Sequence, residues 1–221
     1  MPNLLGLTLE QAVYRRDAVY RQPQWSFDSS LGRYRNAATG RFLSQADALQ
    51  LTQRSIASAQ QEIRSLILSL AQGVLDLGQW QRQFAQLLKE LHLGQFVLGR
   101  GGLRNTTPEN FLEVGRILKA EYRYLEGFGR DLATGRLSVA QATARANLYL
   151  AKTRLSYWAG QRQAMAQGPM PAEMRRQLAP VEHCAECVSY AAAGWVPIGS
   201  LPLPTVDCSC RSNCRCTVQY R

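Results

Sequence analysis

Histidine is nearly absent from this sequence, and acidic residues are scarce. The 221 residues include two histidines, 16 acidic and 26 basic residues, which gives a formal net charge of +10. With only His92 and His183, we find no Ser–His–acid arrangement and no carboxylate pair for acid–base catalysis. The glycines within residues 99–102 form no phosphate-binding loop ahead of a helix and predict a turn. The sequence therefore predicts a protein that is not an enzyme, and its charge favours polyanions or an acidic partner surface.

Cysteine is absent from the first 183 residues, and long apolar runs are absent throughout. No stretch reaches the roughly 18 apolar residues that a membrane-spanning helix needs. Residues 1–11 also lack the basic and apolar parts of a secretory signal. We therefore expect no membrane contact and synthesis in a reducing cytoplasm, where clustered cysteines indicate metal binding rather than disulfides.

Residues 1–43 predict a short helix followed by an extended arm. Thr8 and Gln11 have the spacing of a capping box, so we expect a helix over residues 8–22. Residues 22–44 are rich in serine, glycine, asparagine and aromatic side chains. Within them, Tyr34 to Phe42 indicates two short extended runs around a turn, as a hairpin or an ordered loop. A linker or interaction arm is an alternative interpretation of the same segment.

Residues 44–168 predict a mainly α-helical domain of long amphipathic helices. Apolar residues recur every seven positions, as they do from Leu49 through Ile56 and Ile63 to Leu70, which is typical of helices that pack against one another. We expect these helices to form two antiparallel hairpins, with a glycine-rich loop at 94–106. The predicted helices cover residues 44–73, 77–94, 107–133 and 138–168. Beyond them, a short helical turn is expected at 172–178.

The last part of the chain, residues 169–221, contains every cysteine of the protein: Cys184, Cys187, Cys208, Cys210, Cys214 and Cys216. Cys184 and Cys187 are spaced so that two thiolates can bind one ion from a tight turn, and a second pair must complete the tetrahedron. We predict a zinc site formed by Cys184, Cys187, Cys210 and Cys214. Cys216 and then Cys208 are the alternates. His183 is less suitable because it is adjacent to Cys184.

The small size of this C-terminal module explains why a metal would be needed. It contains few large apolar residues, and a unit of this size rarely folds by apolar burial alone. A structural zinc contributes on the order of 10 kcal/mol of folding free energy. Four thiolates leave no open position for water, so the predicted site is structural rather than hydrolytic. A set of disulfides and a redox-active Cys-x-x-Cys pair are the alternatives.

Several short motifs in the module point to a known family. Cys184-x-x-Cys187 is followed by Gly194-Trp195 with Pro197-Ile198-Gly199, then Leu201-Pro202 and finally Cys214-Arg215-Cys216. This series resembles the C-terminus of tailed-phage minor head proteins of the Mu F-like head morphogenesis family. The resemblance implies a virion structural protein, made in the host cytoplasm, that is oligomeric in the particle and contacts portal, major capsid or neck proteins. It would act in capsid assembly, DNA packaging or delivery.

Residues 132–172 form a basic segment without any aspartate or glutamate. Its cations are Arg136, Arg145, Lys152, Arg154 and Arg162. Such a strip favours either packaged DNA or an acidic protein wall, because phosphates attract cations regardless of base sequence. The alternative function is therefore a sequence-independent DNA-binding protein that uses this basic helix and the zinc module.

Overall fold

The computed structural model describes residues 25–28, 30–31, 33–36, 38–168 and 172–221. The helix predicted at residues 8–22 lies outside these ranges. As expected, the described protein is mainly helical, with two small sheets. Its α-helices are α2 Gln45–Ala71, α3 Leu77–Arg100, α4 Phe111–Ala133, α5 Val139–Lys152, α6 Arg154–Ala166 and α7 Ala185–Ala192. Short 3-10 turns cover Leu103–Asn105, Pro108–Asn110 and Arg211–Asn213. None of the helices in the described ranges is both long and apolar enough to cross a membrane.

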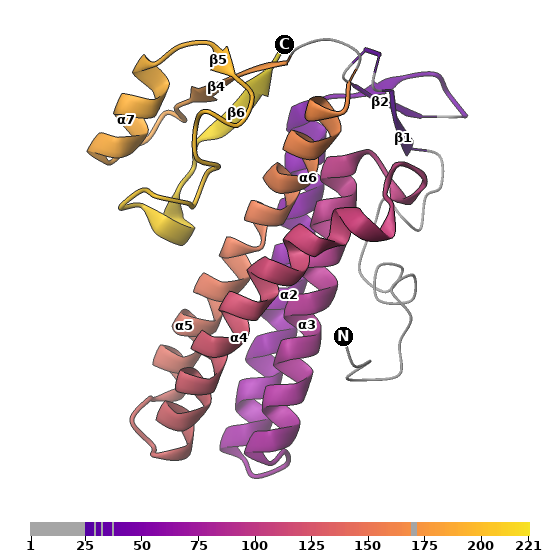
Figure 1. Ribbon diagram of the computed structural model, residues 1–221. Coiled ribbons are helices and arrows are strands. Elements are labelled where there is room, and N and C mark those ends of the chain that lie inside the picture. The colour runs from indigo at the N-terminus through magenta and orange to yellow at the C-terminus, as the bar shows by residue number, and fades with distance from the viewer. Residues whose placement is uncertain (1–24, 29, 32, 37, 169–171) are drawn as a thin grey trace.

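The long helices α2 to α6 lie side by side as a bundle (Figure 1). Two predicted helix starts are confirmed. The Ser44 side chain accepts a hydrogen bond from the backbone N–H of Asp47 at 3.0 Å, and Ser138 caps α5 through Gln141 in the same way. In the centre of the bundle, Trp80 and Phe84 of α3 meet Phe128 of α4 at 5.2 and 6.3 Å between ring centroids.

The prediction that the second helix ends near Gly94 is wrong, because α3 continues to Arg100. Glycine inside a helix ordinarily weakens it by about 1 kcal/mol relative to alanine. Here two glycines allow α3 and α6 to touch at the backbone. A Cβ at Gly99 would lie 2.1 Å from the carbonyl oxygen of Tyr157, and one at Gly160 would lie 2.1 Å from that of Phe96. The close contact between the two helices offsets the low helix propensity of the glycines.

The helix predicted over 138–168 is divided at Thr153 into α5 and α6. The Thr153 hydroxyl donates to the carbonyl oxygen of Leu150 at 2.7 Å and accepts from the Gln95 side chain at 2.9 Å. A hydroxyl that bonds to its own helix competes with the regular backbone pattern and bends the chain. The break therefore lies where α3 anchors the α5–α6 junction.

Both sheets have three antiparallel strands. The first consists of β1 Trp25–Asp28, β2 Arg33–Asn36 and β3 Phe42–Leu43, so the hairpin predicted between Tyr34 and Phe42 is confirmed. The second has the order β5-β4-β6, with β4 Glu173–Gln177 between β5 Val196–Pro197 and β6 Thr217–Tyr220. The helical turn expected at 172–178 is thus wrong, because residues 174–177 of this segment pair with β6.

The C-terminal module packs against the bundle, and apart from its cysteine cluster its buried apolar residues belong to the core of the bundle (Figure 1). Met174, Leu203 and Val218 of the module are buried in one apolar cluster with Phe96 of α3 and Trp158 of α6. The Gln45 side chain at the start of α2 also donates to the carbonyl oxygen of Val218 at 2.8 Å. The module therefore obtains from the bundle part of the apolar burial that its own sequence lacks.

Candidate metal centre

Two cysteines are positioned by α7. Cys184 is the N-cap residue of this helix and Cys187 lies in its first turn. The backbone N–H of Val188 donates to the carbonyl oxygen of Cys184 at 3.2 Å, which fixes the turn between the two thiols. Cys187 is fully buried, whereas Cys184 is half-buried. The Cys-x-x-Cys motif therefore points both thiols toward the loop that carries the other four cysteines.

That loop, residues 205–216, is folded by successive turns. The backbone N–H groups of Arg211, Asn213 and Cys214 donate to carbonyl oxygens three residues earlier, at 2.9 to 3.1 Å. Three residues other than glycine have positive φ in the same loop: Thr205 at 76°, Asp207 at 49° and Arg211 at 46°. Such conformations cost roughly 1–3 kcal/mol each and persist only where the surroundings impose them. The loop thus requires a strong tertiary constraint at its centre.

The sulfur atoms gather in two groups of three that share one residue. Cys184, Cys187 and Cys210 have their Sγ atoms within 4.8 Å of one another, and so do Cys187, Cys214 and Cys216. Of the four ligands predicted from sequence, Cys184, Cys187 and Cys210 lie in the first group. Cys214 lies in the second, with the alternate Cys216. The other alternate, Cys208, is buried in the same cluster but belongs to neither group.

The spacing and chemistry of this cluster fit a tetrahedral metal site. Bonds of about 2.3 Å from zinc to sulfur in a tetrahedron place neighbouring sulfurs about 3.8 Å apart. The Sγ atoms of Cys187 and Cys214 are 3.8 Å apart, whereas a disulfide would require about 2.05 Å. All six cysteines are free thiols. The cluster can hold a metal ion, and thiolates favour soft or borderline ions such as Zn²⁺.

The environment affects the individual thiols in opposite ways. Burial raises the pKa of Cys187 and Cys208, and burial together with Cys214 raises the pKa of Cys216 to about 11. The backbone N–H of Cys187, followed by the Cys210 thiol, lowers the pKa of Cys184. Crowded, buried thiols resist ionisation unless a positive charge lies among them. A bound cation would supply that charge and release protons as it enters.

Two arginines surround the cluster. Arg176 is 3% exposed and places Nη1 3.9 Å from the Sγ atom of Cys214. Its Nη2 atom donates a hydrogen bond to the carbonyl oxygen of Pro202. From α6, Arg154 donates to the carbonyl oxygens of Ser212 and Cys214, both at 3.3 Å. A zinc ion with four thiolates carries a net charge of −2, so these cations balance the charge of a filled site.

His183 lies at the edge of the second group of thiols. Its Nε2 atom is 2.7 Å from the carbonyl oxygen of Ala179, and its Nδ1 atom is 3.5 Å from the Sγ atom of Cys216. Because the carbonyl can only accept, Nε2 carries the proton and Nδ1 presents a lone pair. From sequence, His183 was predicted to be a less suitable ligand because it is adjacent to Cys184. The structure instead points its ring toward Cys216, which is 33 residues away.

The basic strip of residues 132–172 is bound to other parts of the protein. Arg145 pairs with Asp131 at 2.6 Å. Lys152 pairs with the buried Glu121 at 2.6 Å, and Arg162 pairs with Glu113 at 3.0 Å. These acidic residues all belong to α4. The acidic partners of the strip therefore come from α4. These three cations hold α5 and α6 to α4 and do not form a separate charged face.

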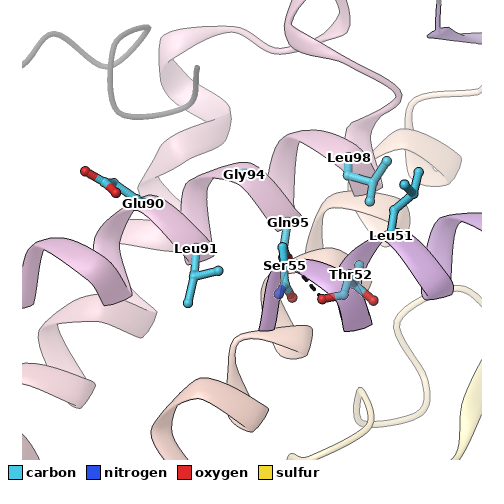
Figure 2. A pocket seen from close by; sticks show the side chains of 8 residues that line it. All are labelled: Leu51, Thr52, Ser55, Glu90, Leu91, Gly94, Gln95 and Leu98. Carbon is cyan, nitrogen blue, oxygen red and sulfur yellow. Dashed lines mark hydrogen bonds between the residues drawn. The ribbon is translucent and has the colours of Figure 1, made fainter. Parts of the chain in front are cut away.

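Two cavities in the described part of the protein are too small to hold a small-molecule substrate. Figure 2 shows one between α2 and α3, where the Ser55 hydroxyl donates to the carbonyl oxygen of Thr52 and the Glu90 side chain points away from the other lining residues. Its volume is about 10 Å³. Another, of about 130 Å³, lies between α2, α6 and the cysteine loop. Small-molecule sites usually occupy about 300 to 1,000 Å³.

Comparison of the chain with protein-family models, with curated proteins and with solved structures finds no match. A fold by itself does not define a function, so the function must be argued from the residues of the site. In this protein those residues are the cysteine cluster and the motifs that surround it.

Proposed function

We propose that this chain is a non-enzymatic structural protein of a tailed-phage virion, of the minor head type, with a C-terminal module held by structural zinc. Its role would be to join other virion proteins during capsid assembly or DNA packaging and delivery. The neighbours that we propose are portal, major capsid or neck proteins.

One observation carries this proposal. The residues of the motifs that resemble the phage family hold the C-terminal module together and pack it against the bundle. The guanidinium groups of Arg175 and Arg221 contact the Trp195 ring, at 4.7 and 4.6 Å from its centroid. Leu201 is buried against the bundle, and Gly199 adopts φ +90° in the turn before it. The motif therefore builds and docks the module.

The proposal of zinc rests on the donor set. Cysteine thiols in groups of three, of which the second group is fully buried, are suited to Zn²⁺, and closed thiolate coordination is typical of structural sites. A closed site gives the ion no water to activate, which supports a structural role and not hydrolysis. The strained loop at 205–216 is the part of the protein that such an ion would hold in place.

The distribution of charge supports docking onto an acidic protein. Arg145, Lys152 and Arg162 belong to the strip that suggested DNA binding, and all three form ion pairs with acidic residues of α4. On the solvent side of α4, exposed basic residues recur at helical spacing. They are Arg116, Lys119, Arg123 and Arg130, and the exposed Glu126 is the one acidic residue within this row. Residues three and four positions apart share one helix face, so this row complements an acidic partner surface.

The test is the composition of intact particles. Particles of the phage that encodes this chain would be purified on a density gradient, and each fraction quantified by mass spectrometry. We expect the chain to follow the major capsid protein at a constant, low ratio. Its absence from particles that contain the portal protein would overturn the proposal.

A pair of phage variants tests the role of the module in the same experiment. Cys187→Ser removes the thiol at the centre of the cluster, whereas Ser189→Ala changes an exposed residue of the same helix. We expect incorporation of the Cys187→Ser chain to fall at least tenfold and that of Ser189→Ala to stay at the wild-type level. Equal incorporation of both variants would show that the module is not the docking element.

A further inference from the structure

The arrangement of the thiols raises the question of how many ions the cluster holds. A single tetrahedral ion would use four of the six cysteines and leave two buried thiols without a role. The two groups of three sulfurs meet only at Cys187, and each is compact enough to surround an ion of its own. Cys187 is also the most buried of the six cysteines, as expected for a ligand at the centre of a larger cluster.

We propose that the module binds two zinc ions bridged by the Cys187 thiolate, the first held also by Cys184 and Cys210 and the second also by Cys214 and Cys216. This inference goes beyond the proposed virion role and does not depend on it. It concerns the number of ions and their ligands, which can be measured on the isolated protein.

Counting the donors shows that two ions can be fully coordinated. Two tetrahedral ions need eight ligand positions. Six cysteines and His183 supply seven donor atoms, and a bridging Cys187 counts twice, which gives eight. Cys208 interacts with Cys214 and with the bridging Cys187, lies outside both groups of three, and is the remaining thiol for the first ion. His183 is then the remaining ligand for the second ion.

The distance from His183 to Cys216 supports this assignment, and on zinc binding the ring would also approach Cys187 and Cys214, because it lies outside their group of three. Typical bond lengths of about 2.3 Å to sulfur and about 2.05 Å to nitrogen place the two donors of a tetrahedral zinc site about 3.5 to 3.6 Å apart. The Nδ1 atom of His183 lies 3.5 Å from the Sγ atom of Cys216. The hydrogen bond from Nε2 to the carbonyl oxygen of Ala179 keeps the Nδ1 lone pair available, as such bonds do for histidines that bind metals.

The first test is the metal content of the full-length protein after it is loaded with zinc and separated from free ions. Elemental mass spectrometry should give two zinc ions per chain. Titration of metal-free protein with cobalt(II) should show absorbance that stops rising at two equivalents. A plateau at one equivalent would overturn the second site while leaving a structural ion, and no bound metal would overturn both ions.

Two single-cysteine variants test which thiols bind which ion. Cys184→Ser disrupts only the first group and Cys216→Ser disrupts only the second, so each variant should retain one ion. A single site made of Cys184, Cys187, Cys210 and Cys214 predicts a different result, in which Cys216→Ser has the wild-type metal content and Cys184→Ser has none. Circular dichroism of each variant would show whether the helical bundle is folded. A loss of metal from a folded variant can then be assigned to the missing ligand.

Spectroscopy tests the bridge in the wild-type protein and the histidine in one variant. In wild-type protein loaded with cadmium, the nuclear magnetic resonance spectrum should show two metal signals coupled through the shared sulfur. Uncoupled signals would rule out the bridge. In the cobalt(II) protein, His183→Gln should shift the visible absorption bands of one ion only. Unchanged bands would exclude His183 as a ligand.

Discussion

The helical bundle and the C-terminal module obtain their order in different ways. In the bundle, residues close in sequence form capped helices, whose apolar stripes then pack, as Ile56 and Ile63 of α2 do with Phe84 of α3. In the module, strands and cysteines that are far apart in sequence meet around a strained loop. The bundle can therefore fold from local patterns, whereas the module depends on contacts between distant segments and on the surface of the bundle.

The largest difference between the two regions should appear when metal is removed. Because a structural zinc contributes on the order of 10 kcal/mol, a chelator should eliminate most of the free energy that protects the loop at 205–216. Hydrogen exchange measured by mass spectrometry should become fast in that loop and in α7. Exchange in α2 and α3 should stay slow. Simultaneous loss of protection in α3 would show that the two regions unfold as one unit.

A smaller effect, confined to the bundle, is expected at the contact between α3 and α6. In Gly160→Ala the new Cβ would collide with the backbone at Phe96, so the helices must separate. We expect the free energy of unfolding to fall by about 3 kcal/mol. The matched control is Gly127→Ala in α4, where the nearest atom is 4.0 Å away. That change should stabilise the protein by about 0.5 to 1 kcal/mol through helix propensity. Equal stability of the two variants in urea would contradict the close contact.

The smallest effect is a pH dependence of bundle stability at His92. Burial, with a smaller contribution from Lys152, lowers the pKa of this imidazole to about 3, compared with about 6.5 in an unfolded chain. Between these values the unfolded chain binds a proton that the folded protein does not. Stability is therefore complete above about pH 6.5 and falls as the pH drops toward 3, by about 2 kcal/mol at pH 5.

Urea unfolding at several pH values, followed by helical circular dichroism, measures this dependence. His92→Gln removes the titrating group and should flatten the slope between pH 5 and pH 7. The same slope in wild type and variant would assign the pH dependence to other groups. Together with the chelation experiment, this separates the acid sensitivity of the bundle from the metal dependence of the module.

The beginnings of helices could be predicted because capping is local. The side chains of Ser44 and Ser138 bond to backbone groups three residues away, so the signal and the structure occupy the same few positions. The end of α3 could not be predicted in this way. Gly94 and Gly99 both interrupt the local pattern, and at Gly99 only the approach of Gly160 from α6 shows why the helix continues.

Strand β4 was missed for a similar reason. Residues 173–177 have no clear apolar alternation, and their conformation depends on pairing with β6, which places Arg176 opposite Val218. The positions of the cations were also decided by distant contacts. From sequence, Arg145 and Lys152 were predicted to belong to an unpaired basic strip. In the structure they form ion pairs with Asp131 and Glu121 of α4.

By itself, the sequence determined that the protein is mainly helical and that its cysteines gather in one small module, because helical periodicity and cysteine spacing are properties of neighbouring residues. The tertiary structure alone decided which thiols meet, since the turns of the loop at 205–216 bring Cys210 to one side of Cys187 and Cys214 and Cys216 to the other. It also turned His183 toward Cys216. Contacts of this kind depend on how distant segments pack, and no local pattern records that packing.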